Sequence, residues 1–295
     1  MQKYLTDVKS TSYITAFASL LITLHCLLAS CNASPSDPKM VTVSIEPQKY
    51  LLEQITGDRV EVRCLLSNGS NPETYDPTVT HLLNLQKSMG YLRMGHIGFE
   101  AALLDKIKQS NPDLPIYNTS EGITPITGTH SHDGVTHTDI DPHTWTSVKN
   151  AKIISKNMLD AMVEIDPANK NYYQRNYERF SHRLDSLDQV ITARLAPKRG
   201  SAFMVWHPSL SYFARDYGLE QIVVGNAEHK DMSISDLKEI IDHAKEHGAN
   251  VFFYQKDFDS RQVEAINTHT DAREISINPL AYDWEKEITE IADAL

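Results

Sequence analysis

The segment that most constrains the fold runs from Asp166 to Pro197, and its residues 168–196 contain neither Gly nor Pro. Asp166 suits a helix N-cap, and Pro167 suits the first helical position, where its missing N–H is not needed. Apolar side chains then recur at spacings of three and four residues, at Tyr173, Tyr177, Phe180, Leu184, Leu187 and Ile191. This pattern predicts one amphipathic helix over residues 166–197, about 45 Å long at 1.5 Å per residue.

Short β-rich runs alternate with helical runs on both sides of this segment. MVTVSIEP, VEVRCLLS, GYLRMG and LPIYNTS precede it, and SAFMVW, QIVVGN, NVFFYQ and REISIN follow it. Such alternation is typical of βα units with parallel strands. The sequence therefore predicts an α/β protein of two lobes, residues 40–165 and 198–295, each a parallel sheet flanked by helices. The long helix would join them as a stiff spine, and the hydrophobic content of 41% is ordinary for such a fold.

Residues 1–30 have the features of a secretory signal peptide. Lys3 and Lys9 precede the apolar run ITAFASLLITLHCLL, and small residues follow it. LASC, which ends at Cys31, resembles a bacterial lipobox, in which the cysteine becomes the lipidated first residue of the mature protein. An ordinary signal with an incidental cysteine is the alternative. We expect a tether over residues 31–39 and an extracytoplasmic protein, lipid-anchored to the bacterial membrane in the periplasm or at the cell surface.

Charge and cysteine content narrow the possible partners. The formal net charge of −11 argues against nucleic acid and favours cationic partners. Cys26 lies in the apolar signal run and Cys31 at the proposed lipidation site, so the mature fold keeps only Cys64 and no intramolecular disulfide is expected. Cys64 falls in the strand-like run VEVRCLLS, which predicts a buried, inert thiol.

Two histidines stand at positions that suit metal ligands. His143 lies between Pro142 and an expected helix start, and His207 directly follows an apolar strand-like run. Ligand sites of α/β proteins lie at the carboxyl ends of strands, where loops aim side chains into a crevice. Asp141 is placed either to cap the helix or to fix the imidazole of His143. Taken alone, a histidine at such a position is more often a surface or capping residue than a metal ligand.

The motifs around these histidines resemble those of the metal-binding solute-binding lipoproteins of zinc and manganese ABC importers, the ZnuA/TroA-like family. The family's DPHxWxxP is similar to DPHTWTSV, its HPAFGYFAxRYGL to HPSLSYFARDYGL, and its DPHxYEPTPSD to NPETYDPTVTH. Its late DPLA is similar to NPLAYDW, and its spine helix to DPANKNYYQRNYERFSHRL. The resemblance covers nearly all of residues 31–295. It implies a monomeric, non-enzymatic carrier that delivers a metal to an ABC permease, with His143 and His207 as ligands.

The sequence departs from the family pattern at two ligand positions. The family's first ligand histidine falls on Glu73, and its last acidic ligand falls on Asn278, which offers only a neutral carbonyl oxygen. If these residues are not ligands, Glu73 is an exposed loop acid and Asn278 is a turn residue. Asp76, Gln255 and Asp283 remain candidates for a supporting role or for substitution of a ligand. Zinc is the expected ion because of the two imidazoles, and manganese is the alternative because the remaining ligands are oxygens.

The remaining histidines are less informative. His130, His132 and His137 lie in a Gly/Thr/His/Asp-rich stretch over residues 121–141, which we expect to be a loop. Relatives selective for zinc often have a longer histidine-rich loop there, and a solvated loop with chance histidines is the alternative. We expect solvent-facing side chains without ligand spacing at His182, His229, His243, His247 and His269.

Two functions of other classes compete with the carrier. A secreted zinc hydrolase would also use two histidines, a carboxylate and an open fourth position, but the chain has no HExxH motif. A surface adhesin with incidental metal binding is compatible with lipidation but leaves the ligand motifs unexplained. The spine helix also predicts that the lobes move little on metal release, with residues 121–141 changing most.

Overall fold

The main sheet of the first lobe is parallel, with the strand order β2-β1-β3-β4, in the computed structural model. The structure describes residues 39–66, 72, 75–132, 135–225, 234–255 and 267–295. The proposed signal peptide and tether, including Cys31, therefore lie outside the described residues apart from Lys39. The strands are β1 (Met40–Val43), β2 (Glu61–Cys64), β3 (Tyr91–Arg93) and β4 (Ile116–Asn118). Connecting them are α2 (Glu46–Thr56), α3 (Val79–Lys87) and α4 (Gly98–Ser110), and α5 (Val148–Ile165) ends the lobe.

The second lobe repeats this architecture, with its described strands parallel in the order β10-β9-β7-β8. The strands are β7 (Ala202–Val205), β8 (Glu220–Val223), β9 (Val251–Tyr254) and β10 (Arg273–Ser276). The helices are α7 (Ser211–Tyr217), α8 (Ile234–Glu246) and α10 (Trp284–Ala294). The predicted fold class, two lobes with helix-flanked parallel sheets, is confirmed.

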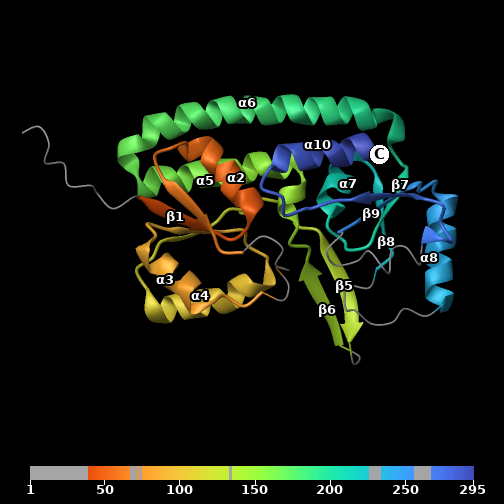
Figure 1. Ribbon diagram of the computed structural model, residues 1–295, viewed down its shortest axis with the longest axis horizontal. Helices are drawn as coiled ribbons and strands as arrows, with labels where there is room; N and C mark the ends of the chain where they lie inside the picture. Colours follow the sequence, from red (N-terminus) through yellow and green to blue (C-terminus); the bar gives the residue numbers. More distant parts are fainter. Residues whose placement is uncertain (1–38, 67–71, 73–74, 133–134, 226–233, 256–266) are drawn as a thin grey trace, which may run out of the picture. The chain divides into compact units, whose positions relative to one another are not determined.

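The long helix α6 (Lys170–Leu195) joins the two lobes. It contacts α2 and α5 of the first lobe and α10 of the second (Figure 1). Its buried face consists of Tyr173, Asn176, Phe180, Leu184, Ile191 and Leu195, while Tyr177 and Leu187 pack against the same core in part. The expected apolar face is therefore the face that is buried.

The beginning of the long helix differs from the predicted capping. The first turn, η3 (Pro167–Asn169), is a 3₁₀ helix, and a second one, η4 (Ala196–Lys198), follows α6. The Asp166 carboxylate does not cap the backbone. It accepts hydrogen bonds from Asn169 Nδ2 and from the Tyr173 hydroxyl, each at 2.7 Å. The aspartate thus orders the first turn through side chains.

Residues 121–141 contain an antiparallel pair of strands where a loop was expected. The strands are β5 (Thr127–His132) and β6 (Val135–Ile140), with His130 opposite His137 in the register. Each strand contains two threonines, and β6 also contains Val135 and Ile140. These β-branched residues favour extended backbone. The glycine and aspartate content of this stretch had concealed the strand pattern.

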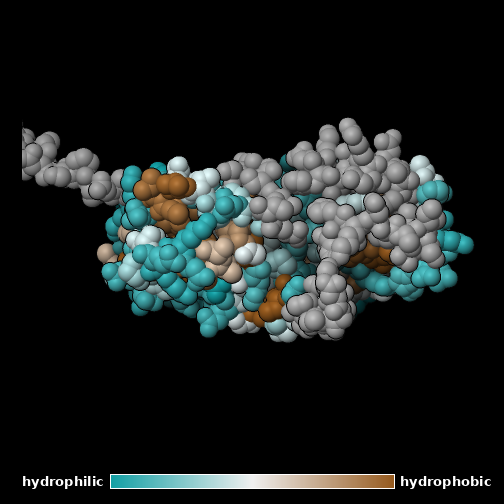
Figure 2. Space-filling model, turned by 90° about the horizontal axis from the view of Figure 1, so that it is seen from below, coloured by the Kyte–Doolittle hydropathy of each residue, from teal (hydrophilic) through white to brown (hydrophobic). Residues whose placement is uncertain are grey.

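A continuous apolar core connects the two lobes through the spine helix. It includes Val43, Leu92 and Met158 of the first lobe, Phe180 of α6, and Trp284 of the second lobe. Among the described residues, no helix is both long and apolar enough to cross a membrane. On the face seen in Figure 2, hydrophilic residues cover much of the described surface and hydrophobic groups lie between them.

Candidate metal-binding site

His143 is held rigidly in the connection between β6 and α5. Its side chain is buried, and it directly precedes the 3₁₀ turn η2 (Thr144–Thr146). The Asp141 carboxylate accepts hydrogen bonds through Oδ1 from the His143 backbone N at 2.9 Å and from the imidazole Nδ1 at 2.8 Å. Because an ionised carboxylate only accepts hydrogen bonds, Nδ1 carries the ring proton. In the neutral imidazole, Nε2 then keeps its lone pair, which is the form of histidine that binds a metal.

The Asp141 carboxyl is suited to this role electrostatically. Burial, the largest single influence, raises its pKa, but the hydrogen bonds and the charge of His143, with a further bond from Ser211, outweigh burial. The net result is a pKa below the ordinary value for aspartate. Asp141 is thus a half-buried, ionised acceptor that fixes both the position and the tautomer of the neighbouring imidazole.

His207 approaches His143 from the opposite lobe. It follows β7 after Trp206, and a turn closed by the Ser209 N–H on the His207 carbonyl at 2.7 Å leads to α7. The Nε2 atoms of His207 and His143 lie 3.2 Å apart. The ring planes are inclined by 76°, with their centroids 5.0 Å apart. Two imidazoles on one tetrahedral zinc ion, each at 2.0–2.1 Å, place their nitrogens about 3.3 Å apart. The observed pair therefore has the separation that chelation of one ion requires.

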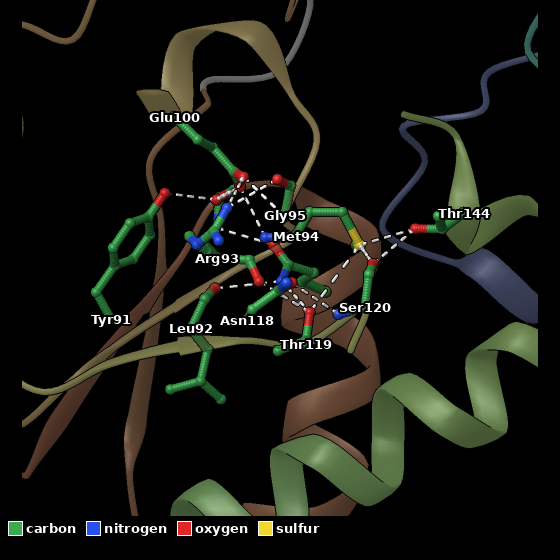
Figure 3. Close-up of polar contacts among 12 residues, drawn as sticks. Tyr91, Leu92, Arg93, Met94, Gly95, Glu100, Asn118, Thr119, Ser120 and Thr144 are labelled. Carbon is green, nitrogen blue, oxygen red and sulfur yellow. Dashed lines mark hydrogen bonds and ion pairs between the residues drawn. The ribbon is translucent and has the colours of Figure 1, made fainter. Parts of the chain in front are cut away.

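Hydrogen bonds from the first sheet support the turn that carries His143. The hydroxyl of Thr144 lies 2.9 Å from that of Ser120, and both hydroxyls donate to the sulfur of Met94 at 3.3 Å. Met94 follows β3 and Ser120 follows β4, so the ends of two neighbouring strands meet the residue next to His143 (Figure 3). This arrangement fixes the turn relative to the sheet.

The network also contains a buried acid that sequence analysis missed, Glu100. Its carboxylate accepts hydrogen bonds from the backbone N–H groups of Met94 and Gly95, both at 2.7 Å, and from the Ser44 hydroxyl (Figure 3). Burial raises the pKa of this carboxyl above its usual value, while these hydrogen bonds act in the opposite direction. An acid within the otherwise apolar run GFEAALL was the available signal. Glu100 holds the loop whose methionine contacts Thr144.

Hydrogen bonds also join the lobes beside the histidine pair. The Trp145 indole donates to the Pro279 carbonyl, and the Trp284 indole donates to the Trp145 carbonyl, both at 2.7 Å. Both indoles are buried. The Tyr212 hydroxyl of α7 donates to the Asp141 carbonyl at 2.9 Å. The backbone on either side of His143 is therefore attached to the second lobe.

Comparisons with known proteins agree with this geometry. Residues 41–292 match the family ZnuA, zinc-uptake complex component A, periplasmic. The chain belongs to this family. A putative metal-binding protein of Chlamydia trachomatis is 27% identical over 93% of this chain and 98% of its own length. The high-affinity zinc uptake system protein ZnuA of Bacillus subtilis is 25% identical over 86% of this chain and 85% of its own. A crystal structure of a ZnuA matches with a TM-score of 0.77 and 34% identity over 87% of this chain and 97% of that one.

The other two predicted ligands of this ZnuA-family chain are not joined to the histidine pair by any described contact. Glu73 lies outside the described residues. Asn278 is exposed, and its Oδ1 accepts a hydrogen bond from the Leu280 N–H at 3.1 Å, as in a turn before a proline. The Asn278 N–H donates to Glu287 at 2.7 Å. Within the described part of the chain, no third histidine, cysteine, aspartate or glutamate completes a metal-ligand group with the pair.

The remaining candidates occupy different places. Asp76 is exposed and forms an ion pair with Lys106 at 3.0 Å. Asp283 is exposed at the N-cap of α10 without a capping hydrogen bond from its side chain, and Gln255 is half-buried after β9. Cys64 is free and half-buried, and its burial, the largest influence, raises the pKa of the thiol well above the usual range, as expected for an inert cysteine.

Proposed function

We propose that this chain is the extracytoplasmic binding component of an ABC importer and carries one divalent metal ion between its lobes. His143 and His207 supply the two nitrogen ligands. The observation that carries the proposal is the 3.2 Å separation of their Nε2 atoms, with Asp141 fixing the His143 tautomer. Family membership and the uptake role named for the Bacillus subtilis relative support a transport function.

Zinc is the cargo that the donor chemistry favours. Two neutral imidazoles bind zinc much more strongly than manganese, which follows from the Irving–Williams order. Manganese is the alternative, because a site completed only by oxygen ligands also suits that harder ion. The spacing of the two nitrogens fits a tetrahedral ion, which further supports zinc.

Glu73 is the proposed third ligand, and Asn278 or water the fourth. Glu73 occupies the position of the family's first ligand histidine, and its carboxylate would supply charge neutralisation for a site whose other ligands are neutral. Asn278 would contribute only its amide oxygen, which also accepts the Leu280 N–H. Asn278 should therefore be the weakest of the proposed ligands.

A carrier explains the surroundings of the site better than a hydrolase does. A zinc hydrolase needs a carboxylate or histidine free to accept a proton from metal-bound water. Asp141, the described carboxylate bonded to the histidine pair, already accepts hydrogen bonds from His143 and Ser211. We further propose that the chain acts as a monomer, is anchored by a lipid on Cys31 and delivers its ion to the membrane permease.

Competition titration of metal-stripped protein against a chromogenic chelator tests the proposal. Wild type should bind one zinc ion tightly and manganese more weakly. His143→Ala and His207→Ala should each weaken zinc binding at least about 100-fold, or about 2.7 kcal/mol. His182→Ala, which removes an exposed histidine of α6, is the matched control and should bind like wild type. Unchanged affinity in both variants would refute the site, and tighter manganese binding would reverse the choice of ion.

Two further measurements separate the alternatives. Zinc-loaded protein should not hydrolyse ester or peptide substrates, and hydrolysis that disappears in His207→Ala would establish the hydrolase instead. Metabolic labelling with a lipid precursor should mark wild type and not Cys31→Ala. An unlabelled wild type would remove the anchor from the proposal and leave the metal site untouched.

A further inference from the structure

A second group of potential metal ligands lies in the other half of the second lobe. Glu220 begins β8, His243 lies in the last turn of α8, and His247 directly follows that helix. Ligand atoms of the three residues all lie within 4.8 Å of one another. The two histidines are exposed and the glutamate is half-buried. The prediction that these two histidines face solvent is confirmed. The prediction that they lack ligand spacing is wrong, because residues four apart lie on the same face of a helix.

The packing of α8 on the second sheet brings the three side chains together. Ile241 and Ala244 are buried in the apolar cluster that α8 forms with the sheet, and α8 contacts β8 (Figure 1). Burial of these two positions fixes the rotation of the helix. It turns the neighbouring histidines toward the start of β8. Glu220 is therefore positioned by the sheet and the histidines by the helix, so the group rests on two packed elements.

The chemistry of the group is that of a divalent-metal site. His243 Nε2 lies 3.0 Å from Glu220 Oε1, and the two imidazole centroids are 4.1 Å apart. His247 Nδ1 lies 3.0 Å from the His243 carbonyl oxygen, so Nδ1 donates to it, and in the neutral ring Nε2 keeps its lone pair. Two imidazoles and a carboxylate are a ligand set used for zinc, copper and nickel. The C-terminal end of a helix also favours a cation.

We propose that Glu220, His243 and His247 form an auxiliary surface site for a zinc-like divalent cation. Three protein ligands on an exposed surface leave the remaining coordination positions to water, so this site should bind more weakly than the site between the lobes and exchange its ion faster. In the absence of metal, His243 and Glu220 pair with each other, and the ion replaces that contact.

This auxiliary site is separate from the histidine pair. Ala202 at the start of β7 is opposite Glu220 in the sheet register, whereas His207 follows the other end of β7. The strand from Ala202 to Val205 covers three residue steps, or roughly 10 Å at about 3.3 Å per residue, and His207 lies two residues beyond its end. One ion cannot bridge that distance. The auxiliary site therefore needs no contribution from His143 or His207.

Zinc titration of the His143→Ala/His207→Ala double variant, followed by the side-chain ¹H–¹⁵N resonances of histidine, tests the inference. Assignment by single substitution identifies the rings of His243 and His247. Both should shift together and saturate at a shared zinc concentration. Glu220→Gln, His243→Ala or His247→Ala should each weaken this binding at least about tenfold. His269→Ala, which removes an exposed histidine from the same lobe, is the matched control.

Each outcome is decisive for this site alone. The auxiliary site would be overturned if the rings of His243 and His247 do not shift, or if they shift equally with and without Glu220→Gln in the double-variant background. Glu220 and His243 would then form only an ion pair. The measurement uses a background without the histidine pair, so failure here leaves the proposed carrier function standing. Failure of the carrier function would appear in wild type titrations, which do not depend on Glu220.

Discussion

Replacement of Asp141 by asparagine should weaken zinc binding although Asp141 is not a proposed ligand. Its carboxylate accepts hydrogen bonds from the His143 backbone N–H at 2.9 Å and from Nδ1 at 2.8 Å. Asparagine keeps an oxygen in place but removes the charge, and charge-assisted hydrogen bonds are about twice as strong as neutral ones. If the amide nitrogen instead faces Nδ1, the ring proton moves to Nε2, which then cannot bind the ion. Loss of such a supporting acceptor typically costs 10- to 100-fold in affinity, or about 1.4–2.8 kcal/mol.

The assay is the same chelator competition, applied to Asp141→Asn, Asp141→Ala and wild type. The alanine variant should be at least as weak as the asparagine variant, because it also removes the oxygen that accepts the His143 backbone N–H. Asp160→Asn, which changes an exposed acid of α5 in the same lobe, should bind normally. Thermal unfolding of the metal-free proteins checks that the fold is retained. Zinc affinity within threefold of wild type in a folded Asp141→Asn protein would refute the argument that this acid prepares His143.

Three further outcomes are expected. Asn278→Asp should tighten zinc binding by about tenfold if the residue faces the ion, because a charged oxygen replaces a neutral one; calorimetry that detects no change would remove this position from the ligand set. Leu184→Ala should lower the free energy of unfolding by about 2–5 kcal/mol in chemical denaturation, and Glu100→Gln by about 1–3 kcal/mol, since both side chains are buried. X-ray scattering profiles with and without zinc should nearly superimpose, with hydrogen exchange changing most in residues 121–141; a clear change in radius of gyration would contradict the spine argument.

Much of the fold could be predicted because its signals are local. The period of apolar residues in α6 required no knowledge of its partners, and Phe180 and Leu184 are buried as that period demands. Short β-rich runs followed by helical ones likewise indicate parallel strands without any reference to distant contacts. The two histidines could be identified as candidate ligands for the same reason. His143 precedes an expected helix start, and His207 follows an apolar strand. Their opposition across the lobes followed only from the family resemblance.

Features that depend on contacts between distant residues could not be predicted from the sequence. Glu100 is an acid within an apolar helix, and its burial makes sense only beside the backbone N–H groups of Met94 and Gly95. Glu220 and His243 are adjacent only because α8 packs on β8 with a particular rotation. The strand pair of residues 127–140 was obscured by its turn-forming residues. In each case the missing information is the tertiary contact.

The indole hydrogen bonds of Trp145 to the Pro279 carbonyl and of Trp284 to the Trp145 carbonyl have a consequence for the kinetics of delivery. They attach the backbone beside one ligand histidine to the opposite lobe, so widening the gap between the lobes would break two buried hydrogen bonds at once. Spontaneous dissociation of a chelated ion should therefore be slow. Transfer to a permease would then proceed by associative ligand exchange, in which incoming donor groups replace one imidazole before the other leaves. The release rate should consequently rise with the concentration of a competing chelator instead of being limited by a constant opening rate.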